Sequence, residues 1–178
     1  MRPSYGRTIM WNKRYTAPEE RVKYIMKRLN VEEDENGKWI EKEYIPTDVT
    51  WVYGSTEEAR QIYINNLIHE SFTDEELLGT VTHVDKITKA GNIKGEFAED
   101  ETKVLVIHNL KNATINEQRL CRLIDGGCFS LGYYDWNNIH IFPEKVYISA
   151  DKTPNQVYAK DQFKDRVIRR VTRVIKLE

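Results

Sequence analysis

Three residues in the middle of the chain have the types and spacing of a metal-dependent catalytic core. Asp85 is followed by Glu101, and Lys103 lies two positions further on. In an Asp…Glu-x-Lys nuclease the two carboxylates hold Mg²⁺, and the lysine stabilises charge or orients the attacking water. There the Glu-x-Lys lies within a strand opposite the aspartate, whereas this sequence predicts a charged loop before the strand. A small metal-dependent nuclease or hydrolase is therefore one hypothesis, and it requires these three side chains to converge.

Histidine side chains offer a second kind of site. His83 and Asp85 alternate along one side of an expected strand. Together with His108 or His140 they would bind a metal ion if their strands adjoin, because imidazole and carboxylate groups are common metal ligands. The alternative is that these are isolated polar histidines on strand surfaces, and on that interpretation the protein has no metal and no cofactor.

The two cysteines, Cys121 and Cys128, are too few for a disulfide framework. A nucleophilic cysteine needs a nearby base and a lowered pKa. Cys121 lies among apolar helix residues and is expected in the core, and Cys128 follows Gly127 at the start of a strand. No apolar run approaches the roughly 18–20 residues that span a bilayer. These features favour a cytoplasmic protein without a membrane partner.

The segment Leu105–Leu110 resembles the first-strand signature of the RNA-recognition motif. That family usually carries an aromatic residue at the second position, where an RNA base stacks, and this chain has Val106 there. The third strand of the family carries a glycine and two aromatics, whereas Lys145–Ile148 offers only Tyr147. The resemblance therefore implies a similar order of elements rather than the usual RNA-binding face, since a fold does not carry a function with it.

Charge is segregated along the chain. Residues 1–30 carry eight Lys/Arg against two Asp/Glu, residues 31–110 carry seven against eighteen, and residues 111–178 carry twelve against eight. The overall formal charge of −1 hides this separation. Such a chain presents a basic surface to phosphate, or its basic ends meet the acidic middle of a neighbouring molecule.

Basic and aromatic residues interleave in an expected N-terminal arm at 1–15, a composition that pairs phosphates and stacks bases. A hairpin tip at 133–138 would expose a tryptophan, and exposed Trp and Tyr are favoured contact anchors; the alternative is a tip folded back on its own domain. If the C-terminal segment is helical, its arginines lie along one stripe; the alternative is an ordinary solvated basic face. The candidate contact residues are Arg7, Trp11, Arg14, Tyr133, Tyr134, Trp136, Arg166, Arg169, Arg170 and Arg173.

Helices are expected at 16–29, 56–71 and 114–125, with a short helix from Thr73 to Gly79, because capping-box pairs precede apolar residues at helical spacing. A further helix is expected at 154–166, where Pro154 permits a helix start. The pairs are Thr16 with Glu19, Ser55 with Glu58, Thr73 with Glu76 and Thr114 with Glu117. Asn36-Gly37 predicts a type I′ hairpin turn. The segment from Val167 to Leu177 is compatible with either helix or strand.

The sequence thus predicts an α+β fold, with a mixed or antiparallel sheet and about four helices. Its C-terminal part can be written as a split β-α-β, ferredoxin-like arrangement. The length fits a single domain over residues 1–178, and the loop at 98–102 is the best candidate for a subdivision.

For function, the preferred hypothesis is a non-catalytic binding or assembly protein that acts through charged and aromatic protein–protein contacts. These would serve self-association or a nucleoprotein or virion-type assembly. Nucleic-acid binding and the metal-dependent hydrolase are the alternatives. A protein partner, including another copy of the chain, is favoured because burying the acidic middle against a neighbour's basic arm explains the segregation without any catalytic site.

Overall fold

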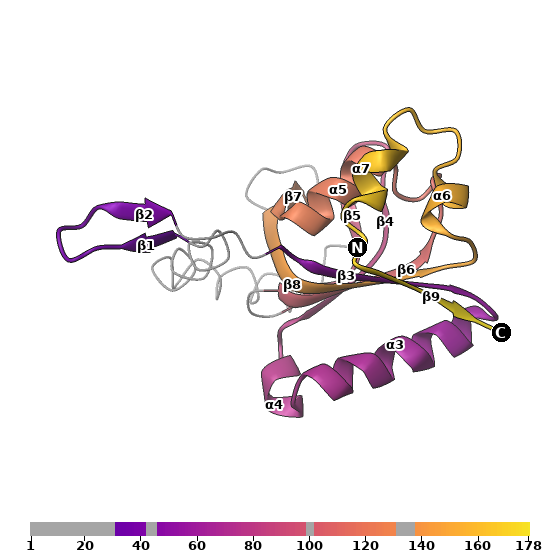
Figure 1. Cartoon of the computed structure of the whole chain (residues 1–178), viewed down its shortest axis with the longest axis horizontal. Coiled ribbons are helices and arrows are strands. Elements are labelled where there is room, and N and C mark those ends of the chain that lie inside the picture. Colours follow the sequence, from indigo (N-terminus) through magenta and orange to yellow (C-terminus); the bar gives the residue numbers. More distant parts are fainter. Residues whose placement is uncertain (1–30, 42–45, 99–101, 131–137) are drawn as a thin grey trace, which may run out of the picture.

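A computed structural model of the chain describes residues 31–41, 46–98, 102–130 and 138–178. Its main body is a mixed β-sheet with helices on both faces, so the predicted α+β class is confirmed (Figure 1). A separate two-stranded sheet is formed by β1 (Val31–Glu33) and β2 (Trp39–Glu41). Among the helices that the structure describes, none has both the length and the apolar character needed to cross a bilayer.

Five strands of the main sheet run parallel to one another. In sheet order they are β4 (Val81–Ile87), β6 (Thr102–Leu110), β8 (Asn138–Ala150), β3 (Asp48–Gly54) and β9 (Arg173–Leu177). Two further strands pair antiparallel: β5 (Ile93–Glu96) with β4, and β7 (Gly127–Ser130) with the first part of β8. The ferredoxin-like detail is not confirmed, because β6 and β8 are adjacent and parallel and β9 pairs with β3.

Helices cover both faces of the sheet because its parallel strands are apolar on both sides. One face carries α3 (Glu57–Ser71) and α4 (Asp74–Leu77). The opposite face carries α5 (Glu117–Asp125), α6 (Pro154–Val157) and α7 (Lys164–Ile168) (Figure 1). The expected buried strand is confirmed in β6, whose alternate side chains enter the two cores.

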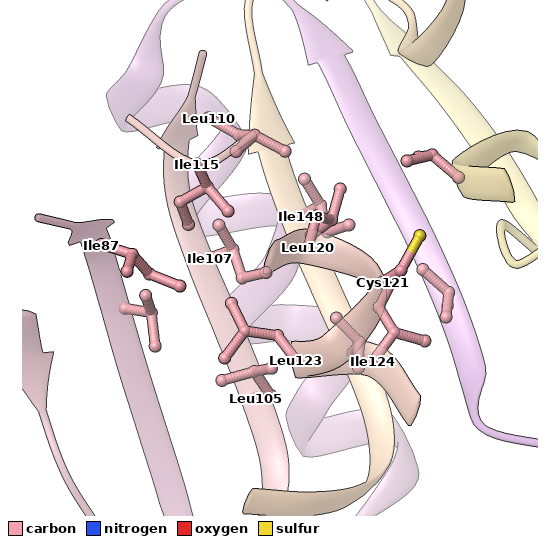
Figure 2. Close-up of a cluster of buried hydrophobic side chains, with 14 of the residues drawn as sticks. Ile87, Leu105, Ile107, Leu110, Ile115, Leu120, Cys121, Leu123, Ile124 and Ile148 are labelled. Atoms are coloured by element: carbon pink, nitrogen blue, oxygen red, sulfur yellow. The ribbon is translucent and has the colours of Figure 1, made fainter. Parts of the chain in front are cut away.

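The larger core lies between the sheet and the α5–α7 face. In Figure 2 the apolar residues of α5 interdigitate with those of β6 and β8. The smaller core lies between the sheet and α3, where Ile64 and Ile68 of the helix are buried. Each core therefore fixes one helical layer onto its own side of the sheet.

Two of the capping-box predictions differ from the structure. Thr73 and Glu76 do form a capping box at α4, as predicted. At α3 the cap is Thr56 rather than Ser55, because Ser55 adopts a positive φ of 46° and still belongs to the turn. At α5 the cap is Asn116, because the hydroxyl of Thr114 bonds within the preceding turn.

The helix expected at 154–166 begins at Pro154 but is two short helices in the structure. Thr153 and Gln156 form a capping box at α6, and the helix stops where Tyr158 turns into the core. The Asp161 carboxylate then accepts the N–H of Phe163, a local bond that competes with helix continuation. The helix expected at 16–29 lies outside the described residues.

The β1–β2 hairpin uses a different turn from the predicted type I′. Type I′ needs positive φ at both central residues, but in this turn Gly37 alone has positive φ (76°). The Asp34 carboxylate accepts the N–H groups of Asn36 and Lys38 at 2.9 and 2.8 Å and so holds the turn. The carboxylate of Asp34, two residues before Asn36, therefore determines the conformation of this turn.

The C-terminal segment ends in strand β9 rather than a continuous helix. Arg166 belongs to α7, Arg169 follows it, and Arg173 begins β9. Of the two alternatives for this segment the strand is therefore the correct one, and the arginines do not form one helical stripe, because pairing with β3 draws residues 173–177, Arg173 among them, into the sheet.

Candidate functional site

Open parallel sheets bind ligands outside the carboxyl ends of their strands, where connections from neighbouring strands leave in opposite directions. The connection from β3 runs through α3 to β4 and passes β8 and β6 on the way. The connection from β8 runs in the opposite direction, through α6 and α7 and past β3 to β9. The switch point therefore lies between β3 and β8. It is lined by the turn at Gly54 and Ser55 and by Ser149 at the end of β8.

Arg60 of α3 fills this switch point. Its side chain is buried, with Nε donating to Ser149 Oγ (2.9 Å) and Nη1 donating to the carbonyls of Gly54 (2.7 Å) and Ser55 (3.0 Å). Among the described residues no carboxylate pairs with it. The guanidinium thus ties the start of α3 to the ends of β3 and β8 through charge-assisted hydrogen bonds.

The first turn of α3 also disfavours an anionic ligand. A helix N-terminus attracts phosphate through its free N–H groups and its dipole. In α3 this position carries the exposed carboxylates of Glu57 and Glu58, and the hydroxyl of Thr56 already accepts the N–H of Ala59. Negative charge therefore stands where a phosphate would approach, and the switch point is a structural junction of the protein.

The structure brings His83 and His108 together on the α3 face of the sheet, because β4 and β6 adjoin. Nδ1 of His83 and Nε2 of His108 are 2.8 Å apart, and Gln61 Nε2 of α3 lies 3.3 Å from Nδ1 of His108. The two rings stack with centroids 5.1 Å apart. If the Gln61 amide donates to His108, then His108 donates to His83, which fixes both tautomers.

The surroundings of His83 disfavour its protonated form. Burial lowers the pKa of His83, and the neighbouring His108 lowers it further. Glu96 and Asp85 oppose this shift but do not overcome it. The contacts of His108 with His83 and with Gln61 link α3 with β4 and β6.

The residues of the nuclease hypothesis are not brought together by the strand register. The N–H of Lys103 bonds the carbonyl of Thr80, so Lys103 lies at the amino end of the β4–β6 pair. Asp85 lies five residues further along β4, roughly 16 Å away along the strand at 3.3 Å per residue. Glu101 lies outside the described residues. Within the part of the chain that the structure describes, no group of three or more His, Cys, Asp or Glu could hold a metal ion.

The two cysteines occupy different settings. Cys121 is buried in α5, as predicted, and burial raises the pKa of its thiol to about 11. A thiol that stays protonated at neutral pH is a poor nucleophile. Cys128 lies in β7, where its backbone is the register partner of His140 in β8.

The two helical layers carry opposite charge. The stretch 57–77, which forms α3 and α4, has six exposed carboxylates, and its one arginine, Arg60, is buried. The stretches 117–125 and 154–170, which include α5, α6 and α7, have seven Lys/Arg against four Asp/Glu. The acidic layer carries Glu57, Glu58, Glu70, Asp74, Glu75 and Glu76, and the basic layer carries Arg119, Arg122, Lys160, Lys164, Arg166, Arg169 and Arg170.

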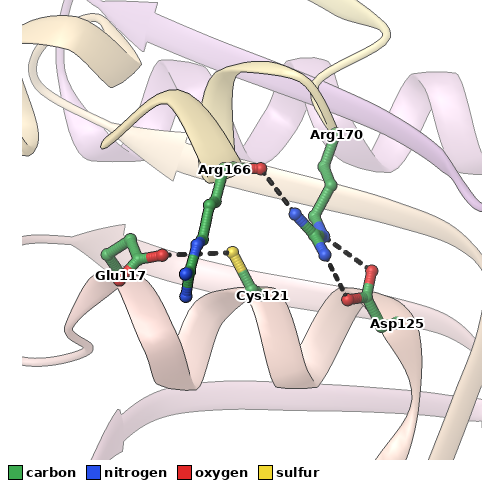
Figure 3. Close-up of polar contacts among 5 residues, drawn as sticks. All are labelled: Glu117, Cys121, Asp125, Arg166 and Arg170. Carbon is green, nitrogen blue, oxygen red and sulfur yellow. Dashed lines mark hydrogen bonds and ion pairs between the residues drawn. The ribbon is translucent and has the colours of Figure 1, made fainter. Parts of the chain in front are cut away.

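The predicted C-terminal arginines divide into structural and exposed groups. Arg170 donates to both carboxylate oxygens of Asp125 (2.7 and 2.6 Å) and to the carbonyl of Arg166 (2.7 Å), which binds α7 to α5 (Figure 3). Arg166 and Arg169 are exposed on the basic layer. Arg173 is exposed in β9 and donates to the Thr50 hydroxyl at 3.3 Å.

The other predicted contact residues lie outside the described residues. They are Arg7, Trp11, Arg14, Tyr133, Tyr134 and Trp136.

Sequence reasoning missed three side chains of note: Arg60, Leu78 and Phe163. Leu78 and Phe163 are exposed apolar side chains, one on each charged layer. The sequence does carry a signal for Leu78, which is a leucine in an otherwise acidic turn. Nothing in the sequence distinguishes a buried Arg60 from the usual exposed arginine, because its partners are two backbone carbonyls and the hydroxyl of Ser149, which is distant in the sequence.

No known family model matches this chain, and no curated protein matches it in sequence.

Proposed function

We propose that this protein is a non-catalytic assembly module that binds other copies of itself through its oppositely charged helical layers. The observation that carries the proposal is the placement of acidic α3–α4 and basic α5–α7 on opposite faces of one sheet (Figure 1). A molecule with two complementary faces matches the next copy without any second protein.

The distance between the layers supports this proposal. A helix with its side chains is about 10–12 Å across, and a sheet lies between the two layers, so their axes are roughly 20 Å apart. The Debye length at physiological salt is about 8 Å. The two layers therefore do not neutralise each other within one molecule, and each presents its charge to a partner.

The polar groups at the switch point and in the histidine pair also favour a non-catalytic role. Arg60 is bonded to Ser149 and backbone carbonyls, and His83 is bonded to His108. A catalytic site keeps such groups available to a substrate with pKa values adapted to the reaction. Here they bond to one another and join the elements of the fold.

The test is self-association of the full chain at two salt concentrations. Sedimentation velocity over a concentration series in 50 mM NaCl should show species larger than a monomer, and 500 mM NaCl should weaken the association. In a gel-shift assay in 50 mM NaCl, the affinity of the protein for a labelled single-stranded oligonucleotide should not exceed its affinity for other copies of itself. A monomer at every concentration in low salt, or association that ignores salt, would remove the proposal.

Charge reversal supplies the matched variants. Glu58→Lys with Glu75→Lys makes the acidic layer more basic, and Lys160→Glu with Arg169→Glu makes the basic layer more acidic. Each double variant should self-associate weakly, and an equimolar mixture should recover heterotypic association because the untouched layers are complementary. Lys94→Glu, on the exposed edge strand β5, changes charge outside both layers and serves as the control.

A further inference from the structure

The acidic layer ends in an exposed apolar side chain. Leu78, which follows α4, is 80% exposed, more than any other large hydrophobic residue in the described part of the chain. Its neighbour Leu77 packs against the smaller core, so Leu78 points the other way. The carboxylates of Asp74 and Glu75 lie in the helix just before it.

The turn that carries Leu78 is held rigidly. Thr73 and Glu76 close a capping box at its start, and the N–H of Leu78 donates to the carbonyl of Asp74. The Thr80 hydroxyl donates to the carbonyl of Glu76 at 2.7 Å. A side chain presented by an ordered turn loses little conformational freedom on binding, which favours a role as a contact anchor.

The basic layer presents a complementary feature. Phe163 precedes α7 and is 44% exposed, and the guanidinium of Arg166 lies 4.2 Å from the centre of its ring. The carboxylate of Asp161 accepts the N–H of Phe163 and fixes its backbone. Exposed Lys160 and Arg169 lie on the same layer. An aromatic anchor flanked by arginine is the composition of an interaction hot spot.

Resting on the proposed self-assembly, we propose that the Leu78 turn of one copy docks against the Phe163 surface of the next copy. Each surface has an apolar centre within charged residues, and the charges of the two surfaces are opposite. A second copy is the occupant that this complementarity favours. Because the two surfaces lie on opposite faces of the sheet, the contact is head-to-tail, and repeated contacts close into a ring or extend as a filament.

Two single variants test this contact by sedimentation in 50 mM NaCl. Leu78→Ser and Phe163→Ser should each weaken self-association by at least tenfold, because a large apolar side chain is no longer buried at the interface. Leu78 is mostly exposed, so circular dichroism and thermal unfolding of Leu78→Ser should match those of the unmodified protein. Phe163→Ser also loses the contact with Arg166, so its circular dichroism should match while its Tm falls by a few degrees. Ile40→Ser removes another exposed apolar side chain, from the β1–β2 hairpin, and should leave association unchanged.

Mixing the two variants distinguishes a head-to-tail contact from other geometries. Leu78→Ser keeps an intact Phe163 surface and Phe163→Ser keeps an intact Leu78 turn, so an equimolar mixture should form a one-to-one dimer and nothing larger. If the unmodified protein associates in a salt-dependent way but the variants associate equally well, this contact is wrong and the charged-layer proposal stands. If the unmodified protein stays monomeric, both proposals fail.

Discussion

Replacing Tyr158 with phenylalanine should destabilise the protein through a single buried hydrogen bond. The Tyr158 side chain is fully buried, and its hydroxyl donates to the carbonyl of Ile115 at 2.8 Å, which ties the α6 segment to the loop before α5. Phenylalanine keeps the ring in the core and strands the Ile115 carbonyl away from water. Leaving a buried polar group unpaired costs about 1–3 kcal/mol. For a chain of this size, each kcal/mol lowers Tm by about 2–4 °C.

The effect of Tyr158→Phe should not depend on pH between 5 and 9. Burial raises the pKa of the Tyr158 hydroxyl far above its usual range, so the hydroxyl remains a donor throughout. Urea unfolding and calorimetry at two pH values would measure it. Tyr53→Phe is the matched control, because Tyr53 packs against the same core and its hydroxyl makes no hydrogen bond within the described residues. Equal stability losses for the two variants would refute this account of the Tyr158 bond.

Three further predictions concern pH, backbone conformation and a helix cap. Burial lowers the pKa of His83 in the folded state, so the contribution of neutral His83 to stability should be complete above about pH 6.5 and should fall as the pH drops below that value. His83→Asn should therefore flatten the change in the urea midpoint between pH 7.5 and 5.5, and an unchanged dependence on pH would count against this prediction. Gly54→Ala should cost more stability than Gly91→Ala, since both have positive φ but only at Gly54 would a Cβ clash with the carbonyl oxygen of Leu177; equal melting temperatures would contradict the clash. Thr153→Ala should cost about 1 kcal/mol by removing the α6 cap, and calorimetry showing no loss would dismiss it.

Local patterns in the sequence were sufficient for several elements of the fold. The apolar run at 104–107 is a buried strand, the helix expected at 56–71 is α3, and Thr73 caps α4 as its spacing with Glu76 predicts. These features depend on residues within a few positions of each other. The capping predictions at Ser55 and Thr114 were wrong because each of these residues belongs to the turn that precedes the helix.

The candidate site was much less accessible from the sequence. The sequence identifies His83 and His108 as polar residues on strands, but their contact depends on β4 lying beside β6. The nuclease hypothesis joins Asp85 and Lys103 in one centre, and the register puts them at opposite ends of the same strand pair. Spacing along the chain does not give distance across a sheet, because the order of strands is set by packing of the whole molecule.

The sequence by itself determined the composition of each segment, including an acidic middle and a basic C-terminal part, because charge and hydropathy are properties of the residues alone. Only the tertiary structure decided that the acidic helices and the basic helices would occupy opposite faces of the sheet. It also decided that Val174 and its neighbours would form a strand, since pairing with β3 satisfies their backbone groups. Such choices depend on which distant segments share a core, and no local pattern contains that information.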